Sequence, residues 1–161
     1  MVDEIYNIRR NRILVAKPAD IGLEPTPNEI WGVLTEMHML KGVATLVVVA
    51  DGSVSLYFSD GRCIAGLGPY SGPRRVGQEL IAFAQSFVDA FSPTKHFPLP
   101  ELGFIRFYRL SDGGVLESEV REDDLGGNPL WPLLQKANEL IAEIRAVKAK
   151  PVAESDRFGR P

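Results

Sequence analysis

The strongest chemical pattern in the sequence is a glycine-rich loop that leads into two arginines. The residues of this pattern are Gly66, Gly68, Ser71, Gly72, Arg74 and Arg75. Free backbone N–H groups and the helix dipole favour an anion where such a loop opens a helix. Arginine opposes the dipole in a first helical turn, which indicates an external negative charge. The loop therefore predicts a site for a small anionic ligand, such as a nucleotide or a phosphorylated metabolite.

The spacing of this loop departs from the known phosphate-binding motifs. Gly66-x-Gly68-x-x-x-Gly72 is not the dinucleotide fingerprint, and no Gly-Lys-Ser/Thr of a P-loop follows. Pro69 and Pro73 also lack the N–H donors that a phosphate cradle uses. The other interpretation is a tight turn before a helix whose basic first turn is solvated.

Metal binding and nucleophilic catalysis have little support in the residue pattern. His38, His96 and Cys63 are the soft metal ligands, and none shares a helical turn or a hairpin with another. The Met-His-Met run at 37–39 suggests copper, but adjacent helix residues point about 100° apart. Neither Ser55 nor Cys63 has a histidine nearby in the sequence, and the GxSxG elbow is absent. We expect no metal, no cofactor and no catalytic residues.

Two carboxylates are the remaining candidates for acid–base chemistry. Glu117 and Glu119 fall on one face of an expected strand, as a pair of catalytic carboxylates would. The acidic run that continues to Asp124 is equally typical of a solvated, charge-protected edge strand. A hydrolase that uses these carboxylates or Ser55 is a distant hypothesis.

The elements that would position these residues begin with a capped helix. Thr26 fits an N-cap, Pro27 the first helical position and Glu29 the third residue of a capping box. Ile30, Leu34 and Met37 then follow at helical spacing, and Gly42 fits a C-cap. These signals predict a helix from about 26 to 41.

Asp-Gly turns predict the strands. Asp51-Gly52 joins the apolar run 43–50 to the alternating run 53–59, which is the strongest short-range hairpin pattern. Asp60-Gly61 leads to a short third strand at 62–65. A further hairpin is expected from 104–110 and 115–121 around a turn with Asp112-Gly113.

Helical spacing of apolar residues predicts two more helices. One opens at Pro73 and runs to Phe91, and the other starts near Asn128-Pro129 or at Pro132. The fold class is therefore α+β, a five-stranded (or nearly so) antiparallel sheet packed with three helices. The expected order is α-β-β-(β)-α-β-β-α.

The segments outside the predicted domain, which covers 26–148, have weaker patterns. We interpret 1–25 as an N-terminal arm with a short strand at 13–16, which packs on its own domain or pairs with a second chain. Residues 149–161 have no apolar periodicity, and we expect them to be disordered. An interface would involve Ile13, Leu14, Val15 and Tyr57. Trp31 and Trp131 either anchor an interface or pack in the core.

Composition excludes several classes of protein. The chain has 161 residues, the length of one domain, and its net charge of −3 argues against nucleic acid as a partner. One cysteine rules out an internal disulfide. The first residues lack the pattern of a signal peptide, and the apolar run 43–50 is far shorter than the roughly 20 residues of a membrane helix. We expect a cytoplasmic protein without membrane contact.

The order of elements resembles the roadblock/LC7 group of profilin-like folds. The resemblance covers about residues 26–148, and its opening is a helix, a glycine and a strand that ends in Asp-Gly, in "GVATLVVVADGSVSLYFSDG". It continues through "VGQELIAFAQSFVDAF" to the last hairpin and helix. The resemblance implies a homodimeric adaptor or regulator without catalytic residues.

The function that we expect from the sequence is that of a non-catalytic protein-interaction or regulatory module, dimeric through self-association. The alternative is a protein that binds a small anionic ligand through the loop at 66–72.

Overall fold

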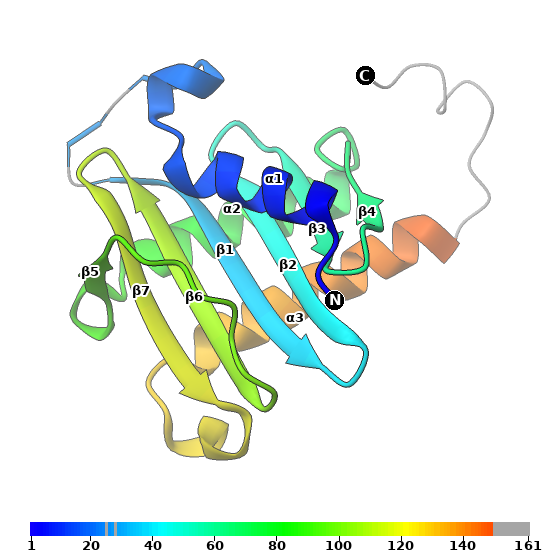
Figure 1. The fold of residues 1–161 in the computed structure, drawn as a ribbon. Helices are drawn as coiled ribbons and strands as arrows, with labels where there is room; N and C mark the ends of the chain where they lie inside the picture. The colour runs from blue at the N-terminus through cyan, green and yellow to red at the C-terminus, as the bar shows by residue number, and fades with distance from the viewer. Residues whose placement is uncertain (25, 28, 150–161) are drawn as a thin grey trace.

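The computed structural model describes residues 1–24, 26–27 and 29–149, which form a three-layer α+β fold (Figure 1). The predicted class is confirmed, but the sheet has seven strands and not five. The α-helices are α1 (Glu4–Val15), α2 (Ser71–Gln85) and α3 (Trp131–Ala149). The strands are β1 (Ile30–Met39), β2 (Gly42–Val49), β3 (Val54–Phe58), β4 (Cys63–Ile64), β5 (Ser92–Thr94), β6 (Phe104–Ser111) and β7 (Gly114–Arg121). The 3-10 helices are η1 (Pro18–Ile21), η2 (Val88–Ala90) and η3 (Glu122–Gly127).

The sheet is antiparallel throughout, in the order β4-β3-β2-β1-β6-β7-β5. The predicted hairpins β2–β3 and β6–β7 are confirmed. Gly52 and Gly61 adopt φ of 94° and 98° in the Asp-Gly turns at 51–52 and 60–61, a backbone conformation that favours glycine. β1 and β6 pair at the centre of the sheet, so two segments far apart in the sequence meet there.

The helix predicted at 26–41 is wrong: strand β1 occupies most of this segment. Every residue from Ile30 to Glu36 is buried, because β1 pairs on both sides and is covered on both faces. A strand covered in this way has apolar residues at consecutive positions, and some of them coincide with helical spacing. Thr26 does not cap a helix, since its carbonyl accepts from the Glu29 N–H in a turn.

The short strand predicted at 13–16 is also wrong, because residues 13–15 form the end of helix α1. The carboxylate of Asp3 caps the helix and accepts from the N–H groups of Ile5 and Tyr6. Tyr6, Arg10 and Leu14, four residues apart, face the sheet and are buried; we call them the inner row. Because the middle residue of this row is an arginine, the apolar residues of the segment do not show a helical period in the sequence.

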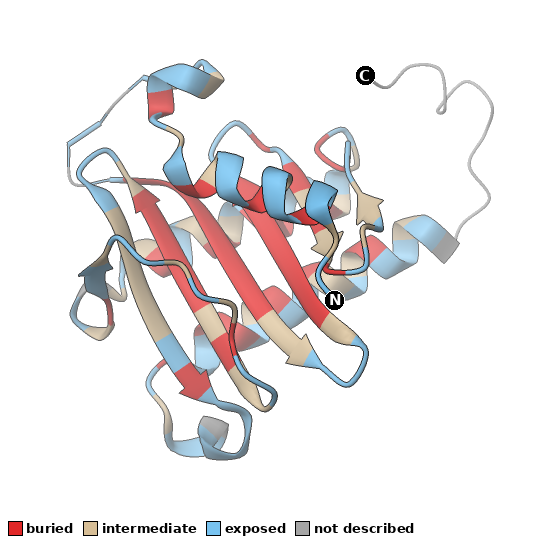
Figure 2. Cartoon of the chain, viewed as in Figure 1, coloured by how far each residue is buried: buried red, intermediate tan, exposed pale blue. Residues whose placement is uncertain are grey.

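Two apolar layers hold the sheet between helices. Helices α2 and α3 cover one face with the larger cluster, and α1 covers part of the other face with a smaller cluster around Leu14, Trp31 and Leu34 (Figure 2). The connector 95–103 crosses the same face as α1 and lies over β6, where Phe97 meets the ring of Tyr108 edge-on. The central strands β1, β2 and β6 are therefore buried on both sides.

The predicted helices of the second half are present with shifted ends. α2 ends at Gln85, before the predicted Phe91, and the chain continues into η2. α3 begins at Trp131, between the two predicted starts, and the side chain of Asn128 accepts from the Leu130 N–H just before it. None of the helices that the structure describes has the length and apolar character of a transmembrane span. The predicted disordered tail lies outside the described residues, apart from Ala149, which ends α3.

Both edges of the sheet are short. β4 contributes two residues and β5 three, and the middle residue of β5 is Pro93, which has no N–H to offer a further strand. A short edge strand, and a proline in an edge strand, both resist pairing with another chain. Association through strand addition is therefore disfavoured at both edges.

Candidate functional site

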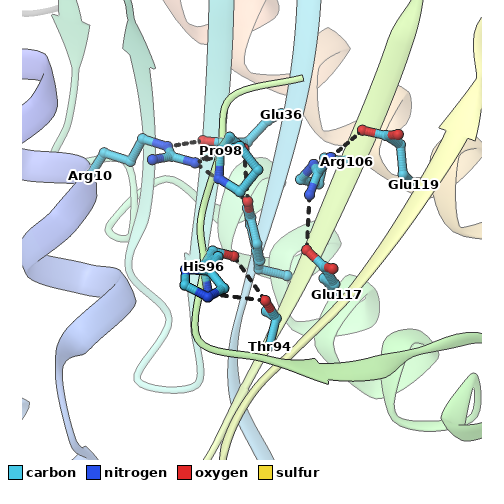
Figure 3. A network of polar contacts seen from close by, with 9 residues as sticks. Arg10, Glu36, Thr94, His96, Pro98, Arg106, Glu117 and Glu119 are labelled. Carbon is cyan, nitrogen blue, oxygen red and sulfur yellow. Dashed lines mark hydrogen bonds and ion pairs between the residues drawn. The ribbon is translucent and has the colours of Figure 1, made fainter. Parts of the chain in front are cut away.

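A carboxylate lies at the centre of the sheet beneath α1. Glu36 of β1 has no exposed side-chain surface, and Arg10 of the inner row binds it through Nε at 2.6 Å and Nη2 at 2.8 Å (Figure 3). Burial disfavours the charge of Arg10, but the hydrogen bonds and charge of Glu36 outweigh it and raise the pKa of the guanidinium. The pair is thus ionised and bidentate, the strongest geometry for such a contact.

Three hydroxyl groups complete this network. Thr45 of β2 donates to Glu36 at 2.8 Å, so Tyr6, at 2.6 Å, donates to Thr45. Tyr108 of β6 donates to the Pro98 carbonyl at 3.0 Å and ties the connector to the sheet. Both carboxylate oxygens of Glu36 accept hydrogen bonds, and the group does not reach solvent. The network suits a structural role rather than catalysis.

Glu117 and Glu119 flank Arg106 and do not form a free carboxylate pair (Figure 3). Arg106 of β6 donates to Glu117 at 2.9 Å and also to Glu119. Its side chain is 14% exposed, so the two carboxylates neutralise a mostly buried cation. The acidic face of β7 is explained by this contact.

A second buried arginine lacks such a partner. Arg109 of β6 is 3% exposed, its guanidinium lies 5.2 Å from the centre of the Phe91 ring, and its Nε has no hydrogen-bond partner among the described residues. Burial lowers the pKa of this group. Arg10 and Arg109 are therefore equally buried, but only Arg10 forms an ion pair among the described residues.

The glycine-rich loop lies at the start of α2, as predicted, but its glycines have structural reasons. A Cβ at Gly68 would lie 2.9 Å from the backbone oxygen of Gly52, and Gly66 has a φ of 70°. Ser71, exposed, is the first residue of α2 and Gly72 the second, where the carboxylate of Glu143 reaches the glycine. The loop packs against the β2–β3 turn.

The two arginines after the loop contact groups of the chain itself. Arg75 pairs with Glu79 at 2.9 Å and lies 3.8 Å from Glu143 of α3. Arg74 lies over Gly52. Glu143 therefore supplies a negative charge where the sequence pattern indicated an external one.

The other candidate residues are dispersed. His96 is exposed on the connector, His38 lies on β1, Cys63 is on the edge strand β4 and Ser55 is on β3. In the part of the chain that the structure describes, no three histidine, cysteine, aspartate or glutamate residues are grouped as metal ligands would be. The cavity described below is lined by His38 but not by Ser55, Cys63, His96 or Glu117.

The structure places the residues expected at an interface in different environments. Leu14 is buried against the sheet and Ile13 is half-buried, whereas Val15 is exposed. Tyr57 is half-buried on β3, and the guanidinium of Arg9 lies 6.0 Å from its ring centre. Trp31 belongs to the core on this face, as its core interpretation predicted.

A cavity of about 820 Å³ opens at the end of the sheet where the β1–β2 hairpin turns. The hairpin, the β3–β4 turn, the start of β6 and the first turns of α3 surround it. Its apolar lining consists of Met37, Met39, Leu40, Val43, Phe58, Leu102, Phe104, Ile105, Trp131 and Leu134. Four of these are the large exposed apolar residues Met39, Leu40, Leu102 and Trp131, so the rim is apolar as well.

The charged side chains that line the cavity are two positive and two negative, so their formal charges sum to zero. Asp60 binds Arg62 at 2.7 Å, and Lys41 and Glu122 supply one further charge of each sign. His38 contacts the Pro100 carbonyl through Nδ1 at 2.8 Å. Because a carbonyl only accepts, Nδ1 carries a proton, which leaves Nε2 as the ring atom that can accept a hydrogen bond.

Sequence reasoning missed this cavity. The sequence predicts the end of a helix at 37–41, whereas these residues form the end of β1 and the hairpin turn before Gly42, whose φ is 131°. The signal was a run of apolar residues directly before Lys41-Gly42, which is unusual for a solvent-exposed turn. The other walls come from segments distant in sequence.

Comparison of the chain with protein-family models, with curated proteins and with solved structures finds no match. The resemblance to the roadblock group therefore stays a prediction. The helix that opens that pattern is strand β1 in the structure.

Replacement of Arg10 by methionine should lower the free energy of unfolding, whereas replacement of Arg109 should not. Arg10→Met leaves Glu36 buried without a cation, so the free energy of unfolding should fall by about 3–5 kcal/mol. Arg109→Met removes an unpaired buried charge and keeps the volume, so stability should be unchanged or higher. Urea unfolding measures both. Equal losses in the two variants would contradict the assigned role of Glu36.

Alkaline pH should weaken the fold through Tyr6 and Tyr108. Burial, reinforced by Glu36, raises the pKa of each to about 12, above the ordinary value of 10.0. Their contribution is complete below pH 10 and is lost as the pH rises through about 12. Urea unfolding across this range should show the loss, and Tyr6→Phe should reduce its slope. An equally steep profile in Tyr6→Phe would show that Tyr6 is not responsible.

Proposed function

We propose that the chain is a non-catalytic binding protein that takes a mainly apolar, uncharged ligand into the cavity at the β1–β2 hairpin. The cavity itself is the observation that carries the proposal. Its volume of about 820 Å³ lies within the roughly 300–1,000 Å³ of ligand pockets, and its lining is mainly apolar with a few polar groups. Both features are typical of small-molecule sites.

The lining also supports a particular class of ligand. Two of the three methionines of the chain, Met37 and Met39, line the cavity, and their flexible side chains adapt to irregular ligands. The charges of the lining cancel, which disfavours a strongly charged ligand. His38 offers an acceptor at Nε2, which suits a hydroxyl or N–H group on an otherwise apolar molecule.

The exposed rim favours a second candidate, a protein-interaction module. Leu40, at the hairpin tip, is 94% exposed, and Leu102, which also lines the cavity, is 58% exposed. A small molecule inside the cavity leaves much of this surface in water, whereas an apolar segment of a partner protein would cover it. The two candidates share the cavity and differ in the size of the ligand.

Binding of the neutral fluorophore N-phenyl-1-naphthylamine tests the proposal. Its emission should rise on mixing with the protein, because it enters an apolar site. Asn138→Phe adds a ring to the cavity wall and should weaken binding by about tenfold, the effect of about 1.4 kcal/mol.

Gln135→Phe is the matched control, because Gln135 is also exposed on α3 but is not part of the lining. It should bind the probe like the original chain. Absence of binding, or equal weakening in both variants, would refute the small-molecule proposal.

A further inference from the structure

Helix α1 carries a second row of side chains on the side away from the sheet. Ile5, Ile8 and Val15 are 54%, 50% and 69% exposed, and Arg12 lies exposed between them. At 100° per residue these four side chains are centred opposite the inner row. We call them the outer row. An apolar row on the solvent side of a surface helix is the reverse of the usual pattern.

The spacing of the outer row is that of a helix-pairing seam. Its steps of three, four and three residues repeat the a and d positions of a coiled coil. The charged Arg12 at one such position restricts the partners and registers that fit. A single helix of twelve residues buries less than the roughly 800 Å² per partner of a standard interface, so the pairing it supports is weak.

The charges of α1 complement those of a second α1 that runs antiparallel to it. Glu4 lies at the start of the helix, Arg12 lies in its last turn, and Lys17 follows two residues after its end. In a parallel pair the two copies of Arg12 would meet, which costs energy. In an antiparallel pair Arg12 lies against Ile8 of the second copy, and Glu4 approaches the basic end. The helix dipoles also oppose each other in this arrangement.

We propose that the outer row pairs with the outer row of a second copy of this chain, as a weak two-fold dimer with antiparallel α1 helices. The interface is isologous, because the same patch serves both copies. It does not rest on the proposed ligand. It assigns Val15 to the contact between copies and leaves Leu14 to the contact with the sheet.

Sedimentation equilibrium over protein concentrations up to about 1 mM tests the dimer. The chain should show a reversible monomer–dimer equilibrium, and Ile8→Glu should be monomeric at every concentration. Circular dichroism should show that Ile8→Glu stays folded, because the inner row is untouched. Leu40→Glu, which places the same charge at another exposed apolar position, should dimerise like the original chain. A monomeric original chain, or loss of the dimer in Leu40→Glu alone, overturns the proposal.

Charge reversal tests the antiparallel orientation. Glu4→Lys and Lys17→Glu should each weaken the dimer by about two- to fivefold, and the double variant should recover the original affinity. In a parallel dimer, Lys17 would lie far from Glu4 of the second copy, and the double variant would not recover. Absence of recovery, or no effect of either single change, overturns the antiparallel pairing.

Discussion

The carboxylate of Glu36 lies at the centre of the sheet beneath α1, and a buried carboxylate is tolerated only with a cation and hydrogen bonds around it. Arg10 supplies the cation and can do so only if α1 lies across β1 and β2. Tyr6 and Leu14, one turn to either side, are then buried as well. The connector 95–103 closes the other side of the network through the Pro98 carbonyl. One ion pair therefore accounts for the position of two segments that the hairpins do not determine.

This arrangement separates the polar centre of the sheet from its apolar end. The centre is filled, and its carboxylate is enclosed by Arg10 and Thr45. The end at the β1–β2 hairpin is open, because the rim residues Leu40 and Leu102 remain exposed around a cavity. The centre thus serves stability, and the open end is where a ligand fits without disturbing the ion pair. Glu117, a residue with potential catalytic chemistry, is paired with Arg106 and lies outside the cavity lining.

The sequence predicted the parts of the fold whose signals are local. The Asp-Gly turns placed β2–β3 and the third strand, and apolar spacing placed α2 and α3. It failed where the signal depends on the tertiary environment. β1 is buried on both faces, so its apolar residues include positions at helical spacing. In α1, Arg10 occupies a buried position where the pattern requires an apolar residue, so the helical period was not recognised. The cavity was not predictable, because its walls join the hairpin at 39–42 to α3, about ninety residues away along the chain.

Methyl NMR spectra during titration with N-phenyl-1-naphthylamine test the central claim, that the hairpin-end cavity is a binding site, most directly. Saturable shifts should appear at the methyl groups of Met37, Met39 and Leu134, which line the cavity. Leu67, buried beside the β2–β3 turn at the opposite end of β2, should not respond. Shifts at Leu67 without shifts at the two methionines, or no saturable shift at all, would contradict the account.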